Sequence, residues 1–418
     1  MKQNEFKETE IGLIPEDWEV ETIGDSSVDI IDGDRGVNYP KKTEFEKEGF
    51  CLFLNTKNVP GERFELSESV FIDKQKDEIL RKGKLQRGDL VLTTRGSLGN
   101  VAYYNDIVPY EHVRINSGMV IVRDSEKTFD TYFLYLLLRS PLLKRQYFGF
   151  ATGSAQPQLP IRDIKKIKLP VPPLAEQKAI AKILSDLDSK IEFNNKMNKT
   201  LEAIGQALFK HWFVDFDFPN EEGKPYKSSG GEMVESELGE IPREWRITKL
   251  GDFFPVKTGK KDANISSDNG KYPFFTCAQN ILHCNNYSFD ESALLLAGNG
   301  DFNIKWYRGK FEAYQRTYVL VPYDKELLGF LYYLMKKNLN DITRGHRGSV
   351  INFITKGMIE NFKVIVPPFN KIRAMATMFN SINRKINSLK KESNPLSQIR
   401  DSLLPRLMSG RIRVGINL

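Results

Sequence analysis

Two long stretches of the chain carry apolar residues spaced alternately by four and three positions, the pattern of a helix with one packed face. In the first stretch these positions are Ile180, Leu184, Leu187, Ile191, Asn194, Asn198, Leu201, Gly205 and Leu208. Adding 195 to each number gives Met375, Phe379, Ile382, Ile386, Leu389, Ser393, Leu396, Arg400 and Leu403. Stripes of this length exceed an ordinary helix of about 8 to 20 residues. The pattern therefore favours two helices packed as a coiled coil over the alternative that each stripe faces only its own domain.

Prolines bound both predicted helices. Pro172-Pro173 precede the first helix, where a missing N–H costs little, and the second helix is expected to end near Pro405 or Gly410. Pro395 falls inside the second helix and removes an interior hydrogen bond. We therefore expect a kink or break near Asn394.

The segments that precede the helices are two copies of one plan. Residues 8–25 (ETEIGLIPEDWEVETIGD) align without gaps on residues 235–252 (ESELGEIPREWRITKLGD) at an offset of 227. Gly153-Ser154 and Val171-Pro172-Pro173 recur as Gly348-Ser349 and Val366-Pro367-Pro368 at an offset of 195. Internal repetition at constant offsets indicates duplicated structural units, and the change of offset makes the second one shorter.

Each half mixes short strand-like apolar runs with turn clusters and one apolar helix, expected near residues 131–147 and 325–340. The predicted fold class is α+β, with two pseudo-repeated globular domains and two long helices. The predicted boundaries are a first domain at 1–168, a first helix at 169–213, a linker rich in Gly, Pro, Ser and charge at 214–234, a second domain at 235–363 and a second helix at 364–410.

Composition narrows the class of protein only slightly. The 61 Lys and Arg residues against 54 Asp and Glu residues give a net charge of +7, a mild bias toward polyanionic partners. Cys51, Cys277 and Cys284 are an odd, scattered set that predicts no disulfide framework and fits a reducing compartment, with the cytoplasm as the default. The apolar runs are too short to cross a bilayer, so no membrane association is expected.

Catalytic and cofactor motifs fail when they are tested one by one. No Gly-x-x-x-x-Gly-Lys-Ser/Thr string occurs, which argues against an ATP-driven motor of the phosphate-loop type. Val366-Pro367-Pro368-Phe369 has a valine where an adenine methyltransferase needs a hydrogen-bond acceptor. Glu222-Gly223-Lys224 lies in a flexible stretch that could not hold Mg²⁺ rigidly, and the His and Cys residues lack zinc-ligand spacing. The chain is therefore expected to have no catalytic residues, metal or cofactor of its own.

Polar, glycine-containing loops remain, and they carry the side-chain types that contact bases and phosphates. These loops differ between the two halves while the frame agrees. The candidate DNA-binding residues of the first half are Arg35, Asn38, Lys57, Asn58, Thr94, Arg95, Ser97, Arg114, Ser154 and Gln156. Those of the second half are Lys260, Lys261, Gln279, Asn280, Asn299, Arg316, Arg344, His346 and Arg347.

Ile14-Pro15-x-x-Trp18, its copy Ile241-Pro242-x-x-Trp245, and Pro172-Pro173-Leu174-Ala175-Glu176-Gln177 at a helix start resemble the specificity subunits of type I restriction-modification enzymes. The resemblance covers essentially the whole chain. It implies two DNA target-recognition domains separated by two helices packed as an antiparallel coiled coil. Each domain is expected to read one half of an asymmetric, interrupted site in double-stranded DNA. A helix of about 40 residues, roughly 60 Å long, is expected to act as the ruler between them.

The resemblance also implies partners. Two methylation subunits that bind adenosylmethionine and two restriction subunits that use ATP and Mg²⁺ are expected to hold the chemistry, while this chain scaffolds them. The residues expected to form the spacer or to contact other subunits are Glu176, Gln177, Leu184, Leu187, Ile191, Phe379, Ile382 and Ile386. Lys371 and Ile372 replace the Glu-Gln pair in the second copy, so equal contacts at the two ends are not expected.

Two other functions stay open on the sequence. One is a specificity subunit of an orphan methyltransferase system, or of an enzyme in which cleavage and methylation are fused in the partner. The other is a DNA-binding adaptor with no methylation partner. All three give the same pattern of repeated frame and unlike loops.

Overall fold

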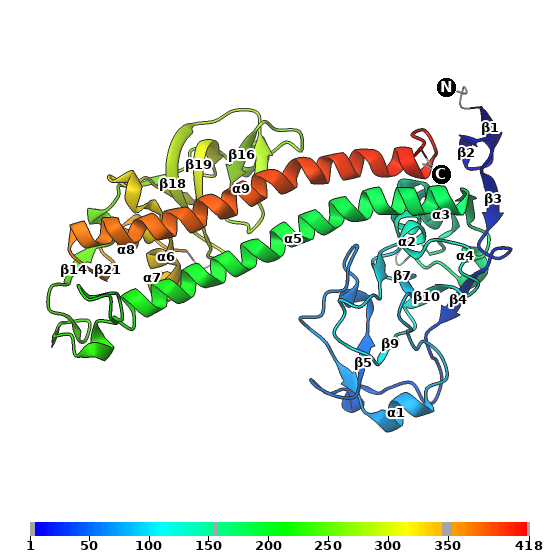
Figure 1. Ribbon diagram of the computed structural model, residues 1–418, viewed down its shortest axis with the longest axis horizontal. Helices are drawn as coiled ribbons and strands as arrows, with labels where there is room; N and C mark the ends of the chain where they lie inside the picture. Colours follow the sequence, from blue (N-terminus) through cyan, green and yellow to red (C-terminus); the bar gives the residue numbers. More distant parts are fainter. Residues whose placement is uncertain (1–4, 154–156, 345–352, 416–418) are drawn as a thin grey trace. The chain divides into compact units, whose positions relative to one another are not determined.

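A computed structural model describes residues 5–153, 157–344 and 353–415 (Figure 1). The chain divides into two compact units. Unit 1 takes Met1–Glu192 and Ser393–Leu418, and unit 2 takes Phe193–Glu392. The two long helices, α5 (Leu174–Phe213) and α9 (Phe369–Met408), each run from one unit into the other, so each unit holds a part of both.

Unit 1 contains a four-stranded sheet and a three-stranded sheet. The first has the order β4 (Val28–Asp32), β10 (Met119–Asp124), β7 (Leu90–Thr93) and β8 (Val101–Tyr103); the second has the order β6 (Phe71–Ile72), β5 (Cys51–Leu54) and β9 (Val113–Ile115). Two further ribbons pair β1 (Phe6–Thr9) with β2 (Gly12–Pro15) and β3 (Glu19–Thr22) with β11 (Lys168–Val171). The short helices are α1 (Lys74–Ile79), α2 (Thr131–Arg139), α3 (Pro141–Phe150) and α4 (Ile161–Ile164).

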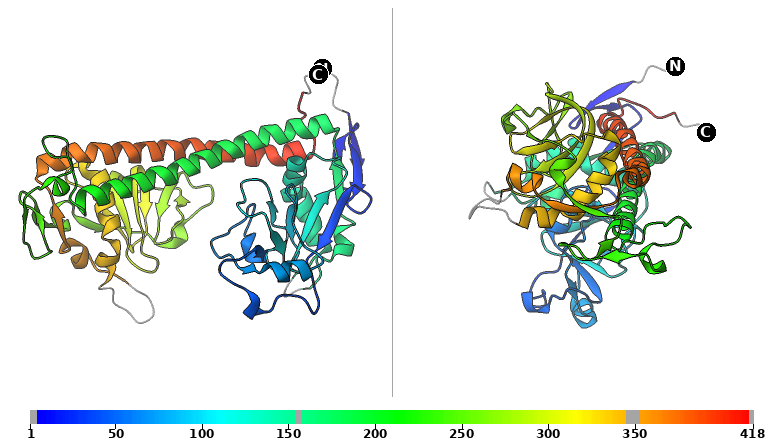
Figure 2. Two further views of the ribbon diagram at one scale, coloured as in Figure 1. Left: turned by 60° about the horizontal axis from the view of Figure 1, so that its bottom comes forward. Right: turned by 90° about the vertical axis from the view of Figure 1, so that its left-hand side faces the viewer.

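Unit 2 repeats this plan around one larger sheet (Figure 2). Its order is β15 (Val256–Thr258), β20 (Thr317–Leu320), β18 (Phe289–Ala297), β19 (Ile304–Ala313), β16 (Tyr272–Phe275) and β17 (Leu282–Cys284). The two ribbons pair β12 (Met233–Val234) with β13 (Ile241–Pro242) and β14 (Arg246–Lys249) with β21 (Lys363–Val366). The short helices are α6 (Leu328–Lys337), α7 (Leu339–Arg344) and α8 (Lys356–Glu360).

The repetition extends to strand register. Phe6 faces Pro15 in unit 1 and Met233 faces Pro242 in unit 2, both at the offset of 227 found in the sequence. Glu19 faces Val171, and correspondingly Arg246 faces Val366. The order β4-β10-β7-β8 is matched by β15-β20-β18-β19. The predicted α+β class and the duplicated plan are confirmed.

Within each unit the two long helices run antiparallel. In unit 1, Asp188 of α5 accepts a hydrogen bond from Arg400 of α9 at 2.9 Å. In unit 2, Asn194 donates to Glu392 at 3.2 Å and the ring of Phe209 lies 5.9 Å from that of Phe379. Residues further along α5 contact residues earlier in α9, as in an antiparallel coiled coil.

The predicted stripes are buried or half-buried at every position, and parts of them also complete the domain cores. Leu184 and Leu187 join the core of unit 1, and Phe379 joins the core of unit 2. Gly205 lies where a Cβ would come within 2.2 Å of the Tyr333 hydroxyl of α6, so this stripe position of α5 packs on the globular part of unit 2. The helix pair and the domain cores therefore share the same side chains.

The start of α5 is tied to unit 1 by two buried polar side chains. Glu176, 0% exposed, accepts a hydrogen bond from the Trp18 indole N–H at 3.0 Å and two from the Arg413 guanidinium, at 2.7 and 2.9 Å. Gln177 accepts from the backbone N–H of Asp130, the N-cap of α2, at 3.0 Å. Arg413 also binds Asp17, and this hydrogen bonding lowers the pKa of the Asp17 carboxyl. The hydrogen bonds with Glu176 and Asp17 raise the pKa of the Arg413 guanidinium. Trp18 is thereby enclosed by segments that lie far apart in the sequence.

Unit 2 encloses its tryptophan with aromatic rings. Lys371 replaces the carboxylate and instead pairs with Glu244, so the buried Trp245 indole N–H has no hydrogen-bond partner within the described residues. Phe218 stacks on the indole at 5.1 Å and Phe216 meets it edge-on at 5.3 Å. Both rings belong to the segment 214–234 predicted as a linker, which is thus fastened to unit 2 at its beginning.

Two expectations about helices are wrong. The helix α9 runs through Pro395 without a break; the proline is exposed, so water can reach the Lys391 carbonyl that has lost its N–H partner. The helix expected over residues 131–147 is two helices. Pro141 occupies the first turn of α3, and the Ser140 hydroxyl caps that helix by accepting from the Leu143 N–H.

We predict that Glu176→Ala destabilises the full chain by about 2–4 kcal/mol, because it leaves a buried indole N–H and a guanidinium without their shared acceptor. Chemical denaturation followed by circular dichroism measures this change. Lys371→Ala, the matched position of the second helix, removes only an exposed ion pair and should cost less than about 1 kcal/mol. Equal effects of the two substitutions would contradict the assigned role of Glu176.

Candidate nucleic-acid interface

In unit 1 the polar loops predicted from the sequence meet where the strands of the two sheets end. The strands β4 and β7 end beside the start of their shared neighbour β10, and the parallel strands β5 and β9 end side by side. The loops that follow these strand ends, together with the segment before α4, form the first loop cluster: residues 33–38, 55–58, 94–97, 116–118, 152–153 and 157–158.

Close backbone approach holds the first loop cluster together. A Cβ at Gly33 would lie 2.4 Å from the Asn116 carbonyl oxygen, so only glycine fits there. The N–H of Thr94 donates to the Gly118 carbonyl at 2.9 Å, and the Thr94 carbonyl accepts from the N–H of Leu159 at 3.0 Å. The loops therefore form one connected surface.

Exposed cations lie on this surface. Arg35 and Arg95 line one pocket of about 270 Å³ together with Gln158, and Lys57 is exposed nearby on the loop that touches Gly96 and Gly118. Arg35 pairs with Asp32 at 3.0 Å. In the described part of the chain neither Lys57 nor Arg95 forms an ion pair, so both charges are available to a phosphate or a base.

Two cations that the sequence reading missed join the first loop cluster. Asp34 accepts hydrogen bonds from the backbone N–H groups of Arg35, Arg81 and Lys82, and this contact places the 81–82 turn, whose two residues are exposed, beside the 33–38 loop. Burial raises the pKa of Asp34, but these N–H donors outweigh it and hold the pKa below its ordinary value. The basic run before Gly83 was the available signal.

Unit 2 has a second loop cluster, residues 257–261, 276–280, 298–301 and 314–316. A Cβ at Gly259 would lie 2.3 Å from the Tyr314 carbonyl oxygen, and the N–H of Gln315 donates to the Lys261 carbonyl at 2.9 Å. Gln279 donates to Asp301 at 2.7 Å. These contacts join the loops of unit 2 into one surface.

Two side chains inside the second loop cluster position its loops. Asn303, 6% exposed, donates to the carbonyls of Cys277 and Asp301, both at 2.8 Å. Lys305 donates to the Ala278 carbonyl at 2.7 Å, and burial lowers the pKa of this lysine. Neither was predicted, because a strand residue gives no sign in the sequence of the loop that it supports.

Equivalent backbone contacts connect the loops in the two clusters. The N–H of Leu159 donates to the Thr94 carbonyl and the N–H of Ile354 donates to the Gly298 carbonyl, both at 3.0 Å. Isolated bridges join Arg95 to Gln158 and Asn299 to Phe353. The frame is thus conserved between the units while the side chains at the surface differ.

The structure corrects three candidate DNA-binding residues. Arg114, 5% exposed, is bound to Asp77 and to the carbonyls of Leu80 and Lys82. Burial raises the pKa of Asp77, but its ion pairs with Lys84 and Arg114 outweigh burial and lower it. Asn58 and Thr94 are also buried, because their side chains bind backbone groups of neighbouring loops. All three support the loops rather than reach a ligand.

The remaining candidates stay predictions. Exposed on the two units are Arg35, Lys57, Arg95, Ser97, Lys260, Lys261, Gln279, Asn280, Arg316 and Arg344, and half-buried are Asn38 and Asn299. Ser154, Gln156, His346 and Arg347 lie outside the described residues.

The spacer candidates are internal to this chain. Glu176, Gln177, Leu184, Ile191, Phe379 and Ile386 are buried, and Leu187 and Ile382 are half-buried. Glu176 and Gln177 lie in the long helix α5 as expected of spacer residues, and their side-chain hydrogen bonds are made within unit 1; contact with another subunit stays a prediction.

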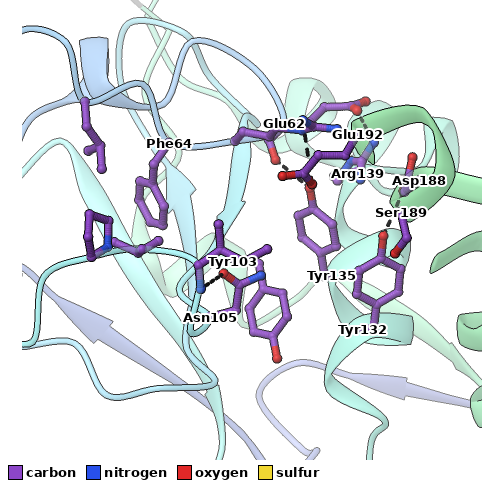
Figure 3. A pocket seen from close by; sticks show the side chains of 15 residues that line it. Glu62, Phe64, Tyr103, Asn105, Tyr132, Tyr135, Arg139, Asp188, Ser189 and Glu192 are labelled. Carbon is purple, nitrogen blue, oxygen red and sulfur yellow. Dashed lines mark hydrogen bonds and ion pairs between the residues drawn. The ribbon is translucent and has the colours of Figure 1, made fainter. Parts of the chain in front are cut away.

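A pocket of about 320 Å³ in unit 1 shows polar groups that brace the fold (Figure 3). Tyr132 of α2 donates to Asp188 of α5 at 2.8 Å, and Arg139 pairs with Glu62 over the ring of Tyr135. Burial raises the pKa of Tyr135 to about 12, so its phenol stays protonated and cannot act as a base near neutral pH. The pocket links α2, α5 and the 62–66 loop.

No group of three His, Cys, Asp or Glu side chains is placed to hold a metal ion in the described ranges. Cys51, Cys277 and Cys284 are free thiols, and burial raises the pKa of Cys51 to about 12. No helix in the described part of the chain is long and apolar enough to cross a membrane.

The duplicated α+β units, the antiparallel helices and the two loop clusters define a DNA-recognition protein with two reading domains. The family model for the type I restriction modification DNA specificity domain matches residues 15–203 and 242–398, so the chain belongs to this family and is a specificity subunit. The resemblance seen in the sequence is thereby confirmed.

Relatives and a solved structure agree with the family. The type I restriction enzyme MjaIX specificity subunit of Methanocaldococcus jannaschii is 28% identical over 99% of this chain and 97% of its own length. The EcoDI specificity subunit of Escherichia coli is 40% identical over 42% of this chain and 40% of its own. The S subunit of the type I restriction-modification system of M. genitalium has a similar fold, with a TM-score of 0.62, 19% identity and coverage of 93% of this chain and 96% of that one.

We predict opposite effects for two arginines of unit 1. Arg95→Ala should change the free energy of unfolding by less than about 0.5 kcal/mol but weaken DNA binding by about 1–3 kcal/mol. Arg114→Met should destabilise the fold by about 3–5 kcal/mol, because it leaves Asp77 buried with one fewer cation. Thermal unfolding and binding titrations of both variants separate the two roles. A DNA-binding defect of folded Arg114→Met that exceeds that of Arg95→Ala would reverse the assignment.

Proposed function

We propose that this specificity subunit reads a bipartite, asymmetric DNA site, with the first loop cluster reading one half and the second loop cluster reading the other. The observation that carries the proposal is the pair of loop clusters, which share backbone joints but differ in surface side chains. Equivalent backbone contacts place each loop cluster at the same position on its own unit. Because the surface side chains differ between the clusters, their base preferences differ as well.

The charge of the two surfaces supports DNA rather than a neutral ligand. Exposed cations occur in both clusters, at Arg35, Lys57 and Arg95 in unit 1 and at Lys260, Lys261 and Arg316 in unit 2. Cations position a protein on phosphates, and the neighbouring Asn, Gln and Ser side chains are suited to base edges. Loops on a braced frame also need little ordering when they bind.

Chemistry is assigned to partner subunits. We place adenosylmethionine and adenine methylation on two methylation subunits, and ATP-dependent translocation and Mg²⁺-dependent cleavage on two restriction subunits. The chain itself acts as a DNA-binding scaffold, and its site of action is the cytoplasm. The long helices support this role because each is continuous from one reading unit to the other.

The test is a domain exchange. Residues 235–363 are replaced by the matching domain of a relative, the chimera is co-expressed with the cognate methylation subunit, and methylated adenines are mapped by long-read sequencing. One half of the recognised sequence should change and the other should persist. The reciprocal exchange of residues 1–168 should change the other half. If both halves changed in one chimera, or neither did, independent reading by the two units would be disproved.

We also predict that the purified chain alone has no methyltransferase, nuclease or ATPase activity. Each assay is run with and without the methylation and restriction subunits, and activity should appear only with them. Turnover of adenosylmethionine or cleavage of DNA by the chain alone, abolished by a substitution within it, contradicts this prediction.

A further inference from the structure

Val37, at the tip of a turn in the first loop cluster, is 97% exposed. The other large apolar side chains that the structure describes reach at most 70%, at Tyr323. Full exposure of a branched apolar side chain forgoes the stabilisation that burial gives. Val37 therefore contributes little to the core of unit 1, and its whole side chain is accessible to a ligand.

The turn that carries Val37 is fastened on both sides. On one side Gly33 lies against the Asn116 backbone and the Asp34 carboxylate accepts from the N–H of Arg35 at 2.7 Å and of Arg81 at 2.5 Å. On the other side the ring of Tyr39 meets that of Phe53 edge-on at 5.7 Å. Val37 is thus presented on a braced support.

The backbone of the turn holds its tip away from the rest of unit 1. Gly36 has φ +107°, a conformation that residues with a Cβ rarely adopt, and a Cβ there would have no atom within 4 Å. The N–H of Tyr39 donates to the Gly36 carbonyl at 3.1 Å and closes the turn around Val37. The valine has open space around it on a backbone that is itself held.

Basic residues belong to the turn that carries the exposed valine and to the turn packed beside it. Arg35 is two residues away, and Arg81 and Lys82 come from the turn that Asp34 anchors. The equivalent turn of unit 2, after Gly259, carries Lys260 and Lys261, and residues 260–264 include no large apolar side chain. The apolar tip is therefore a property of the first loop cluster and not of the shared frame.

We propose that Val37 is a specificity-determining residue that contacts the 5-methyl group of a thymine in the half-site read by unit 1. This inference rests on the proposed reading function of that unit. Among base-edge groups in the major groove, the thymine methyl is the one that an apolar side chain recognises, and the flanking cations would hold the phosphates on either side.

The test uses the assembled methyltransferase, the full chain with its methylation subunits, and a duplex that contains the site found by methylation mapping. Each thymine of the unit 1 half-site is replaced in turn by deoxyuridine, which lacks only the methyl group. Binding should weaken about fourfold at one position, the effect expected for one buried methyl-sized group. With Val37→Ala, the thymine and deoxyuridine duplexes should bind equally at that position.

Two variants serve as controls. Val37→Thr keeps the shape and one methyl group and should retain a reduced sensitivity to deoxyuridine. Ile107→Ala removes an apolar side chain that is 63% exposed outside the first loop cluster and should keep the full fourfold effect.

The inference is overturned if no thymine of that half-site is sensitive, or if Val37→Ala keeps the wild-type sensitivity. It is also overturned if Val37 variants weaken assembly with the methylation subunits instead of DNA binding, because Val37 would then contact protein. The domain exchange is read separately: it can succeed while the deoxyuridine series fails, which would leave the reading function intact and remove only the role of Val37.

Discussion

The burial of one tryptophan in each unit, Trp18 and Trp245, is the constraint on which the rest of the structure depends. Each indole follows an Ile-Pro strand and lies in the same core as residues of a long helix. The strand β3, which follows Trp18, pairs with β11, which leads into the start of α5. Each tryptophan is therefore buried partly by side chains of the long helices, which ties the position of the helices to the core of each unit.

Because the shared core fixes the strand ends, the loops that follow them can differ in sequence while their ends keep the same positions. Gly33 and Gly259 must remain glycine, because any side chain there would collide with a carbonyl group of the neighbouring loop. Between such points the side chains are free to differ, as Val37 and Lys261 do. A reading surface can change its base preference in this arrangement while its support keeps the same backbone hydrogen bonds.

The repeat, the α+β class and both long helices were predictable because constant offsets and a sustained four-three spacing leave few alternatives. The convergence of the loops could be expected only from the resemblance, since contacts such as Thr94 with Gly118 join residues of different strands. Arg114 was misassigned for the same reason: in sequence it is a loop arginine, and only tertiary structure brings it to Asp77. The break between α2 and α3 was visible in Ser140-Pro141 but was outweighed by the apolar run.

The two units solve the burial of the tryptophan with different chemistry, and the difference follows from two matched positions. Position 176 is Glu where position 371 is Lys, and position 218 is Phe where position 413 is Arg. In unit 1 the carboxylate requires a cation, which Arg413 supplies while also binding Asp17. In unit 2 neither member of the ion pair is present, and Phe218 covers the indole by stacking. Exchanging only Arg413 leaves the buried Glu176 carboxylate without its cation, and exchanging only Glu176 leaves the Trp18 N–H without its acceptor, so this pair must be kept or replaced as a whole.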